Sequence, residues 1–262
     1  MTKQAWIIFA AVIVVGLGAL IYLSRGDSID VSGIDLSKII STSDQIEEYQ
    51  SGLKDRVYGN PDADTTLIVY GDFQCPGCAT FDQRLYDVLA DEKYEDTVRV
   101  VHRNFPIKSI HPNAFSAAAY AEAIAIQDED AFWEFKTRLY RNQQTWSASQ
   151  PKDRDGQILS FAADLDLDMD KVREDAKSEK VNQKIEFDIA LGKANGVNAT
   201  PTIFLDGELT TTDQIGDAAS IRESLDASIK KHSASGTEDK DAKREEEADK
   251  SSDEDADASS DK

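Results

Sequence analysis

Residues that bind metals or carry thiol chemistry are scarce in this chain, which has two cysteines and three histidines in 262 residues. Both cysteines lie in one segment, Cys75-Pro76-Gly77-Cys78. Two cysteines at this spacing could form half of a zinc site, which would need further ligands. There is no third cysteine, and His102, His111 and His232 lack the spacing of a ligand set. The sequence therefore predicts no metal site.

Basic residues are also in deficit. The 29 lysines and arginines face 50 aspartates and glutamates, a net charge of −21. Nucleic-acid binding needs a basic surface, so we exclude that class of function. Much of the acidic excess lies in residues 232–262, which contain no aromatic or branched aliphatic residue. Such a segment buries too little apolar surface to offset the entropy of ordering, so we predict a disordered tail. Solvation explains its charge more simply than binding to a cationic partner.

One long run without charge, Trp6–Leu23, stands at the N-terminus. At ~1.5 Å per residue a helix of this length spans about 27 Å, close to the ~30 Å hydrocarbon core of a bilayer. A cleaved signal peptide is the alternative, but its apolar region is usually about 7–15 residues long and ends in a small-x-small site. Here Ile21-Tyr22-Leu23 follow the small residues, which favours an uncleaved membrane anchor over residues 1–25.

The charges beside this run give it an orientation. Lys3 and the terminal amine precede it, whereas Arg25 and Asp27 follow it. This weak positive-inside bias places the bulk of the chain outside the cytoplasm. Disulfides form and persist in that compartment, so the anchor and the pair of cysteines support each other.

The rest of the chain alternates strand and helix signals without an internal repeat. A mixed polar linker, residues 26–56, precedes the folded part. The expected order is a strand at 65–70, a helix after the cysteines, a strand at 98–105, a long helical stretch at about 111–193, a strand at 202–205, a hairpin through Asp206-Gly207 into 208–212, and a closing helix to about residue 231.

The spacing of the two cysteines suits reversible disulfide chemistry. A helix N-terminus lowers the pKa of the first thiol, because unpaired backbone N–H groups and the helix dipole favour negative charge there. The second thiol lies about one turn further on and can resolve a mixed disulfide. A purely structural disulfide is the alternative, but closing a four-residue loop removes little chain entropy. We favour redox chemistry at Cys75 and Cys78.

Two motifs resemble those of the thioredoxin superfamily, and more closely its DsbA-like branch. They are the segment from Tyr70 to Cys78, and Ala199-Thr200-Pro201-Thr202 directly before the third strand. The resemblance covers residues 57–231 and implies an α/β thioredoxin-like fold with a helical insertion at about 111–193, here preceded by one N-terminal transmembrane helix.

The resemblance also assigns roles to residues. It implies that Cys75 is the exposed nucleophile and Cys78 the resolving thiol, with Pro76 and Gly77 tuning their reactivity. It implies a cis bond before Pro201, contact of that proline with the cysteines, and pairing of the Thr200 backbone with a substrate peptide.

Two positions depart from the pattern of these relatives. Many have a buried acidic residue six positions before the first cysteine, where this chain has Val69. Asp72 is the nearest carboxylate in sequence. Strongly oxidising relatives carry a histidine between the cysteines, and Pro76-Gly77 lacks one, which predicts a less extreme oxidant.

We therefore expect a membrane-anchored, extracytoplasmic thiol–disulfide oxidoreductase, an oxidase that passes the Cys75–Cys78 disulfide to exported cysteine-containing proteins. No metal or organic cofactor is implied. The resemblance implies a membrane quinone-linked enzyme as the reoxidising partner. Two alternatives stay open: the same fold acting as a reductase or isomerase, and a non-catalytic adhesion or assembly module with an inert disulfide.

Overall fold

The structure, a computed structural model, describes residues 29–31, 33–35, 38 and 52–234. Its contacts divide the chain between Gly33 and Ile34, and the fold below belongs to the second part. In the described residues no helix is long and apolar enough to cross a membrane. The expected anchor at residues 6–23, most of the linker and nearly all of the acidic tail lie outside the described residues.

Five strands form one mixed sheet. They are β1 (Arg56–Gly59), β2 (Thr65–Gly71), β3 (Val98–Asn104), β4 (Thr202–Leu205) and β5 (Glu208–Leu209), in the order β1-β3-β2-β4-β5. Strands β2 and β3 are parallel, while the other neighbouring pairs are antiparallel. The expected strands at 65–70, 98–105 and 202–205 are present within one residue at each end, whereas β1 was not predicted.

The last strand is shorter than its expected range, 208–212. It ends at Leu209 because Thr211 begins a capping box with Gln214, which starts the short helix α10 (Thr212–Ile215). The expected closing helix follows as residues 218–234.

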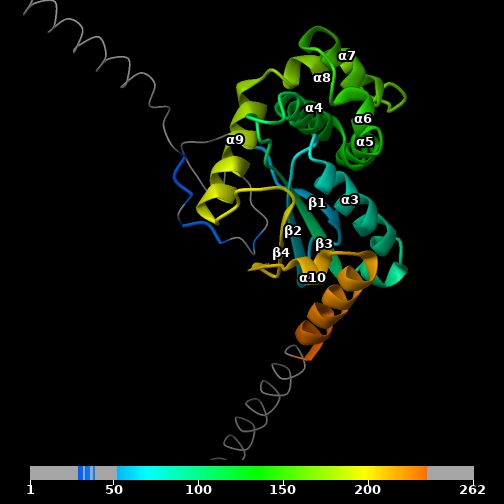
Figure 1. Cartoon of the computed structure of the whole chain (residues 1–262), viewed down its shortest axis with the longest axis vertical. Helices are drawn as coiled ribbons and strands as arrows, with labels where there is room; N and C mark the ends of the chain where they lie inside the picture. Colours follow the sequence, from blue (N-terminus) through cyan, green and yellow to red (C-terminus); the bar gives the residue numbers. More distant parts are fainter. Residues whose placement is uncertain (1–28, 32, 36–37, 39–51, 235–262) are drawn as a thin grey trace, which may run out of the picture. The chain divides into compact units, whose positions relative to one another are not determined.

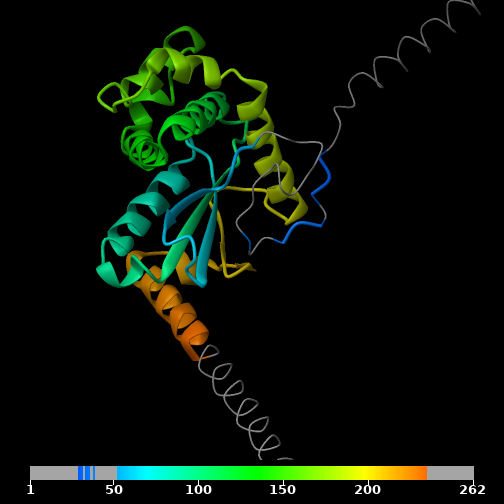
Figure 2. The ribbon, with the colours of Figure 1, turned by 180° about the vertical axis from the view of Figure 1, so that it is seen from behind.

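Alternation along β2 separates two cores. Leu67 and Val69 face the side on which α3 (Pro76–Leu89) and the closing helix pack, through residues such as Leu85 and Ile221. Ile68 and Tyr70 point to the opposite side and join a larger core with the inserted helices. The sheet thus lies between two helical layers, with α3 on one face and α9 (Glu179–Ala194) on the other (Figures 1 and 2).

The expected helical stretch between β3 and β4 is present, but it is broken into six helices. Besides α9 they are α4 (Ala114–Gln127), α5 (Glu129–Arg141), α6 (Gln143–Trp146), α7 (Pro151–Ser160) and α8 (Met169–Asp175). Figure 1 shows α4–α8 gathered beyond one end of the sheet, while α9 runs back along it. The apolar residues on the inner faces of these helices are buried, among them Phe132, Phe135, Leu139 and Ile185.

The described fold extends upstream of Val57. Leu53 is buried in the larger core. Asp55 is buried too, and its carboxylate accepts two hydrogen bonds from the Arg103 guanidinium, at 2.8 and 3.3 Å. Arg56, in turn, pairs with Glu122 at 3.0 Å. Each of these charges has an opposite partner, as burial requires.

Candidate active site

The two cysteines sit where β2 passes into α3. Cys75 is the N-cap residue of α3, and Pro76 occupies the first helical position, where its missing N–H costs no hydrogen bond. The Cys75 N–H donates to the Asp72 carbonyl at 3.0 Å, which closes the turn before the helix. Cys78 follows on the inner side of the first turn. Both thiols are free.

The loop before β4 lies over this helix terminus. The Thr200–Pro201 bond is cis, as the resemblance predicts. The Cys75 thiol donates to the Thr200 carbonyl at 3.1 Å. A Cβ added at Gly77 would stand 3.2 Å from Pro201 Cδ and 3.6 Å from Cys75 Sγ, so the loop approaches closely where the chain has glycine.

The environment of the two sulfurs separates their pKa values. The pKa of Cys75 is lowered to about 5, chiefly by a hydrogen bond from the Cys78 thiol. Hydrogen bonds from the Thr200 side chain and from the N–H groups of Cys78 and Gly77 also lower it, whereas burial raises it. Burial raises the pKa of Cys78 well above its ordinary value. Cys75 is therefore the thiolate near neutral pH, and Cys78 keeps its proton.

Cys75 is less open than the resemblance implies. It is 8 % exposed, against 3 % for Cys78, because the loop around Thr200 covers it. The order of exposure agrees with the expected roles. Together these contacts bring the predicted residues Cys75, Gly77, Cys78, Thr200 and Pro201 to one place.

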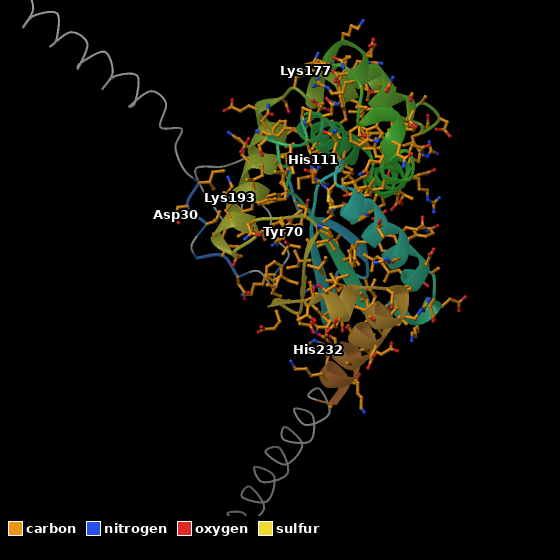
Figure 3. All side chains as sticks on the ribbon, in the orientation of Figure 1. Asp30, Tyr70, His111, Lys177, Lys193 and His232 are labelled. Carbon is orange, nitrogen blue, oxygen red and sulfur yellow. The ribbon has the colours of Figure 1, made fainter. Side chains whose placement is uncertain are left out.

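Asp72 is the first of two polar side chains whose roles the sequence did not reveal. Its buried carboxylate accepts hydrogen bonds from the N–H groups of Gln74 (2.7 Å) and Ile107 (2.8 Å) and lies 2.8 Å from His111 Nδ1. The Asp72 N–H points at Cys78 Sγ, 3.4 Å away. His111, labelled in Figure 3, thereby ties the segment after β3 to the turn that carries the cysteines.

Gln143, at the start of α6, is the second. Its amide donates to the carbonyls of Phe73 (2.8 Å) and Cys75 (3.0 Å). These bonds fix the turn from the insertion side. No local sequence signal links Gln143 to the cysteines, because the contact spans 68 residues.

The described residues contain no group of three or more His, Cys, Asp or Glu side chains placed to hold a metal ion. His102 lies in the core between aromatic rings, whereas His111 binds Asp72. The chemistry of this site is that of the two thiols.

The pKa values predict selective alkylation of the reduced protein. At about pH 6, brief treatment with iodoacetamide should modify Cys75 and leave Cys78 unmodified, because only Cys75 is a thiolate there. The rate should fall as the pH is lowered through about 5. Peptide mass spectrometry assigns the label, and a label mainly on Cys78 would reverse the two roles.

Comparison with known proteins agrees with this geometry. The family model described as Thioredoxin matches residues 51–231. The chain belongs to the thioredoxin family. Within it, the structure resembles proteins of the DsbA type, as the motifs around Cys75 and Pro201 predict.

Two solved structures show the shared fold. BdbD from Bacillus subtilis in its oxidised form has a TM-score of 0.58 and 22 % identity, covering 67 % of this chain and 93 % of BdbD. Wolbachia pipientis alpha-DsbA1 has a TM-score of 0.56 and 17 % identity, covering 68 % and 92 % of the two chains.

Curated relatives include a disulfide bond formation protein and several antiporters. A probable disulfide bond formation protein D from Bacillus cereus is 27 % identical over 66 % of this chain and 78 % of that protein. A Na(+)/H(+) antiporter NhaA 1 from Mycolicibacterium gilvum is 34 % identical over 66 % of this chain but 26 % of the antiporter. The chain thus spans about a quarter of the length of these antiporter relatives.

Proposed function

We propose that this protein is a thiol–disulfide oxidoreductase that acts as an oxidase, with Cys75 as nucleophile and Cys78 as resolving thiol. The observation that carries the proposal is the placement of the two thiols one helical turn apart, with Cys75 at the N-terminus of α3 against the Thr200 carbonyl and Cys78 in the core. The lowered pKa of Cys75 and the raised pKa of Cys78 support it. The site needs no metal or organic cofactor, because the Cys75–Cys78 disulfide itself accepts the two electrons that the substrate thiols give up.

The reaction follows from the leaving groups. A substrate thiolate attacks Cys75 Sγ of the oxidised protein, the Cys75–Cys78 bond breaks, and Cys78 leaves and takes up a proton. A second substrate thiolate then attacks the substrate sulfur, and Cys75 leaves as a thiolate. Its low pKa makes Cys75 a good leaving group in this second step, so the substrate ends oxidised and the protein reduced.

The Thr200–Pro201 loop supplies the place for the substrate. The Thr200 carbonyl already accepts the Cys75 thiol, and it covers the sulfur that a substrate must reach. We assign to Thr200 the pairing with a substrate backbone, to Pro201 the contact that holds this loop against Gly77, and to Pro76 and Gly77 the tuning of the thiols.

The proposal also assigns a role to each segment of the chain. We assign residues 1–25 to a membrane anchor, 26–56 to a linker, 57–231 to the oxidoreductase domain with its insertion at about 111–193, and 232–262 to an acidic tail. The last residues of this linker pack with the domain, because Leu53 joins its core and Arg56 begins β1. The anchor places the domain outside the cytoplasm, where its substrates are exported cysteine-containing proteins and a membrane quinone-linked enzyme reoxidises it. Similarity to the Bacillus cereus protein, whose name is probable disulfide bond formation protein D, supports the part of the proposal that concerns disulfide exchange.

Two assays on one preparation test the direction of the reaction. The purified protein, in detergent if the anchor requires it, should refold a reduced, disulfide-dependent substrate well above the rate with glutathione disulfide alone. It should catalyse the reduction of insulin by dithiothreitol poorly, because the stabilised Cys75 thiolate disfavours the disulfide-bonded form of the protein. The Cys75→Ser variant is the blank in both assays.

The outcomes separate the alternatives. Efficient insulin reduction with a reduction potential near the ~−270 mV of thioredoxin would make the protein a reductase or isomerase. Failure in both assays, with Cys75 unreactive after mild reduction, would favour an adhesion or assembly module with an inert disulfide.

A further inference from the structure

Cys78 must exchange a proton during every turnover, although it is buried. When Cys78 attacks a mixed disulfide it has to lose its proton, and when it is expelled it regains one. Burial raises the pKa of its thiol, so the proton does not leave unaided near neutral pH. Val69 lies beside Cys78 and has no group that can accept a proton.

A carboxylate other than that of Asp72 lines the same cavity as Cys78. Asp82 lies four residues after Cys78 on α3, so the two side chains share one face of the helix. Both line a small inner cavity of about 10 Å³, the size at which a polar cavity begins to hold one water molecule. The other polar side chains of its wall are those of His102, Trp133, Lys136 and Tyr140.

Asp82 forms an ion pair with Lys136 of α5, and both side chains are mostly buried, at 12 % and 10 % exposure. The same two residues also line an outer pocket of about 410 Å³ between α3, α5 and the β1 edge of the sheet. The pair therefore stands on the boundary between a pocket that is open to solvent and the cavity that reaches Cys78.

The wall of the inner cavity includes two side chains with buried polar atoms, His102 and Trp133. Among the described residues, neither ring nitrogen of His102, which is 1 % exposed, nor Nε1 of Trp133 has a hydrogen-bond partner. Buried polar groups of this kind are generally satisfied by ordered water. These groups favour a water molecule between Asp82 and the Cys78 thiol.

The other nearby carboxylate is less suited to this task. The Asp72 carboxylate is engaged by two backbone N–H groups and by His111, and it is the Asp72 N–H, not its carboxylate, that meets Cys78 Sγ. Within the part of the chain that the structure describes, the remaining ionisable groups around Cys78, Asp82 and Lys136 are Cys75 and Tyr86 (α3), Tyr58 (β1), His102 (β3), and Glu134, Arg138, Tyr140 and Arg141 (α5).

We propose that Asp82, held by Lys136, relays the proton of Cys78 between the inner cavity and the outer pocket. In the resolving direction the Cys78 thiol gives its proton, through the cavity, to the Asp82 carboxylate. The Cys78 thiolate attacks Cys75 Sγ of the mixed disulfide, the Cys75–Cys78 bond forms, and the substrate sulfur leaves as a thiolate. Asp82 then releases the proton to the outer pocket. This inference rests on the proposed function and assigns to α3 the acid that β2 lacks at Val69.

The test separates the two steps of oxidation by glutathione disulfide. The reduced protein is mixed with glutathione disulfide, quenched with acid at short times and analysed by mass spectrometry between about pH 5 and 9. The first step, attack by Cys75, gives a glutathione mixed disulfide, and the second, attack by Cys78, removes it. In the Asp82→Asn variant the rate of the first step should stay within about twofold of the wild-type rate. The rate of the second step should fall about tenfold or more at neutral pH. The defect should shrink as the pH rises, because hydroxide then takes the proton.

Two further variants keep the test decisive. Asp87→Asn makes the same change on the exposed side of α3 and should leave both steps unchanged. Asp82→Leu combined with Lys136→Met replaces the pair by apolar side chains of similar size, a change that buried pairs often tolerate, and should show the same slow second step.

A wild-type second step in both Asp82 variants, or equal slowing of both steps, would overturn the relay. If the wild-type protein forms neither the mixed disulfide nor the Cys75–Cys78 disulfide with glutathione disulfide, the proposed oxidoreductase function would instead be contradicted.

Discussion

A Cys78→Ser variant is expected to accumulate in cells as mixed disulfides with its substrates. The Cys75 thiolate can still attack a disulfide of a substrate, because its position at the N-terminus of α3 is unchanged. The substrate disulfide then breaks, its other sulfur leaves as a thiolate, and a mixed disulfide with Cys75 forms. The covalent intermediate has lost the intramolecular thiol that would otherwise release it, so it persists. Non-reducing gels should show adducts of high mass that disappear on addition of dithiothreitol, and mass spectrometry of these bands identifies the substrates.

The matched control is the double variant Cys75→Ser with Cys78→Ser, which should form no adduct. Because a hydrogen bond from the Cys78 thiol is the largest cause of the low pKa of Cys75, a Cys78→Ala variant, which has no donor at this position, should alkylate more slowly near pH 6 than the wild-type protein. Folded, exported Cys78→Ser protein without adducts would argue for the inert disulfide.

Much of the sheet was predictable because its strands are local apolar runs. All residues of β2 are buried, and the run of β-branched residues after the turn at Pro61 predicts it directly. Strand β1 was missed because it has only four residues and half of them are exposed. It is held by its pairing with β3 and by the contact of Arg56 with Glu122, 66 residues away, and no local pattern encodes such a contact.

The site divides in the same way. The cysteines and Thr200–Pro201 stand in short motifs that can be recognised from the sequence, and the structure brings both motifs together. The groups around them come from separate elements. Asp82 and Lys136 are 54 residues apart, and Asp72 and His111 are 39 apart. One sequence shows which residue types are present but not which of these distant side chains converge. The contacts of the Asp72 side chain and the pairing of Asp82 with Lys136 could therefore not be predicted.

The reduced protein is expected to be more stable than the oxidised protein at neutral pH, by an amount that grows with pH. In the unfolded reduced chain, Cys75 stays protonated up to its ordinary pKa of 9.0, whereas in the folded protein it ionises at about 5. Between these two values the unfolded state binds more protons, so the free energy of unfolding rises with pH, by at most about 1.4 kcal/mol per pH unit for one proton. This stabilisation is complete above about pH 9 and is lost as the pH falls through about 5.

The difference between the two redox forms isolates this thiol. The oxidised protein has no thiol at Cys75 that could titrate. Other groups titrate in both forms, among them Asp188, whose pKa is raised by burial, and their effects on stability largely cancel in the difference. Urea unfolding of both forms at several pH values between about 5 and 8 measures the difference. The Cys75→Ala variant, studied reduced, should lack the rise that the wild-type reduced protein shows. Because preferential stabilisation of the reduced form is what makes a disulfide oxidising, parallel curves for the two wild-type forms would contradict both the low pKa of Cys75 and the oxidase direction.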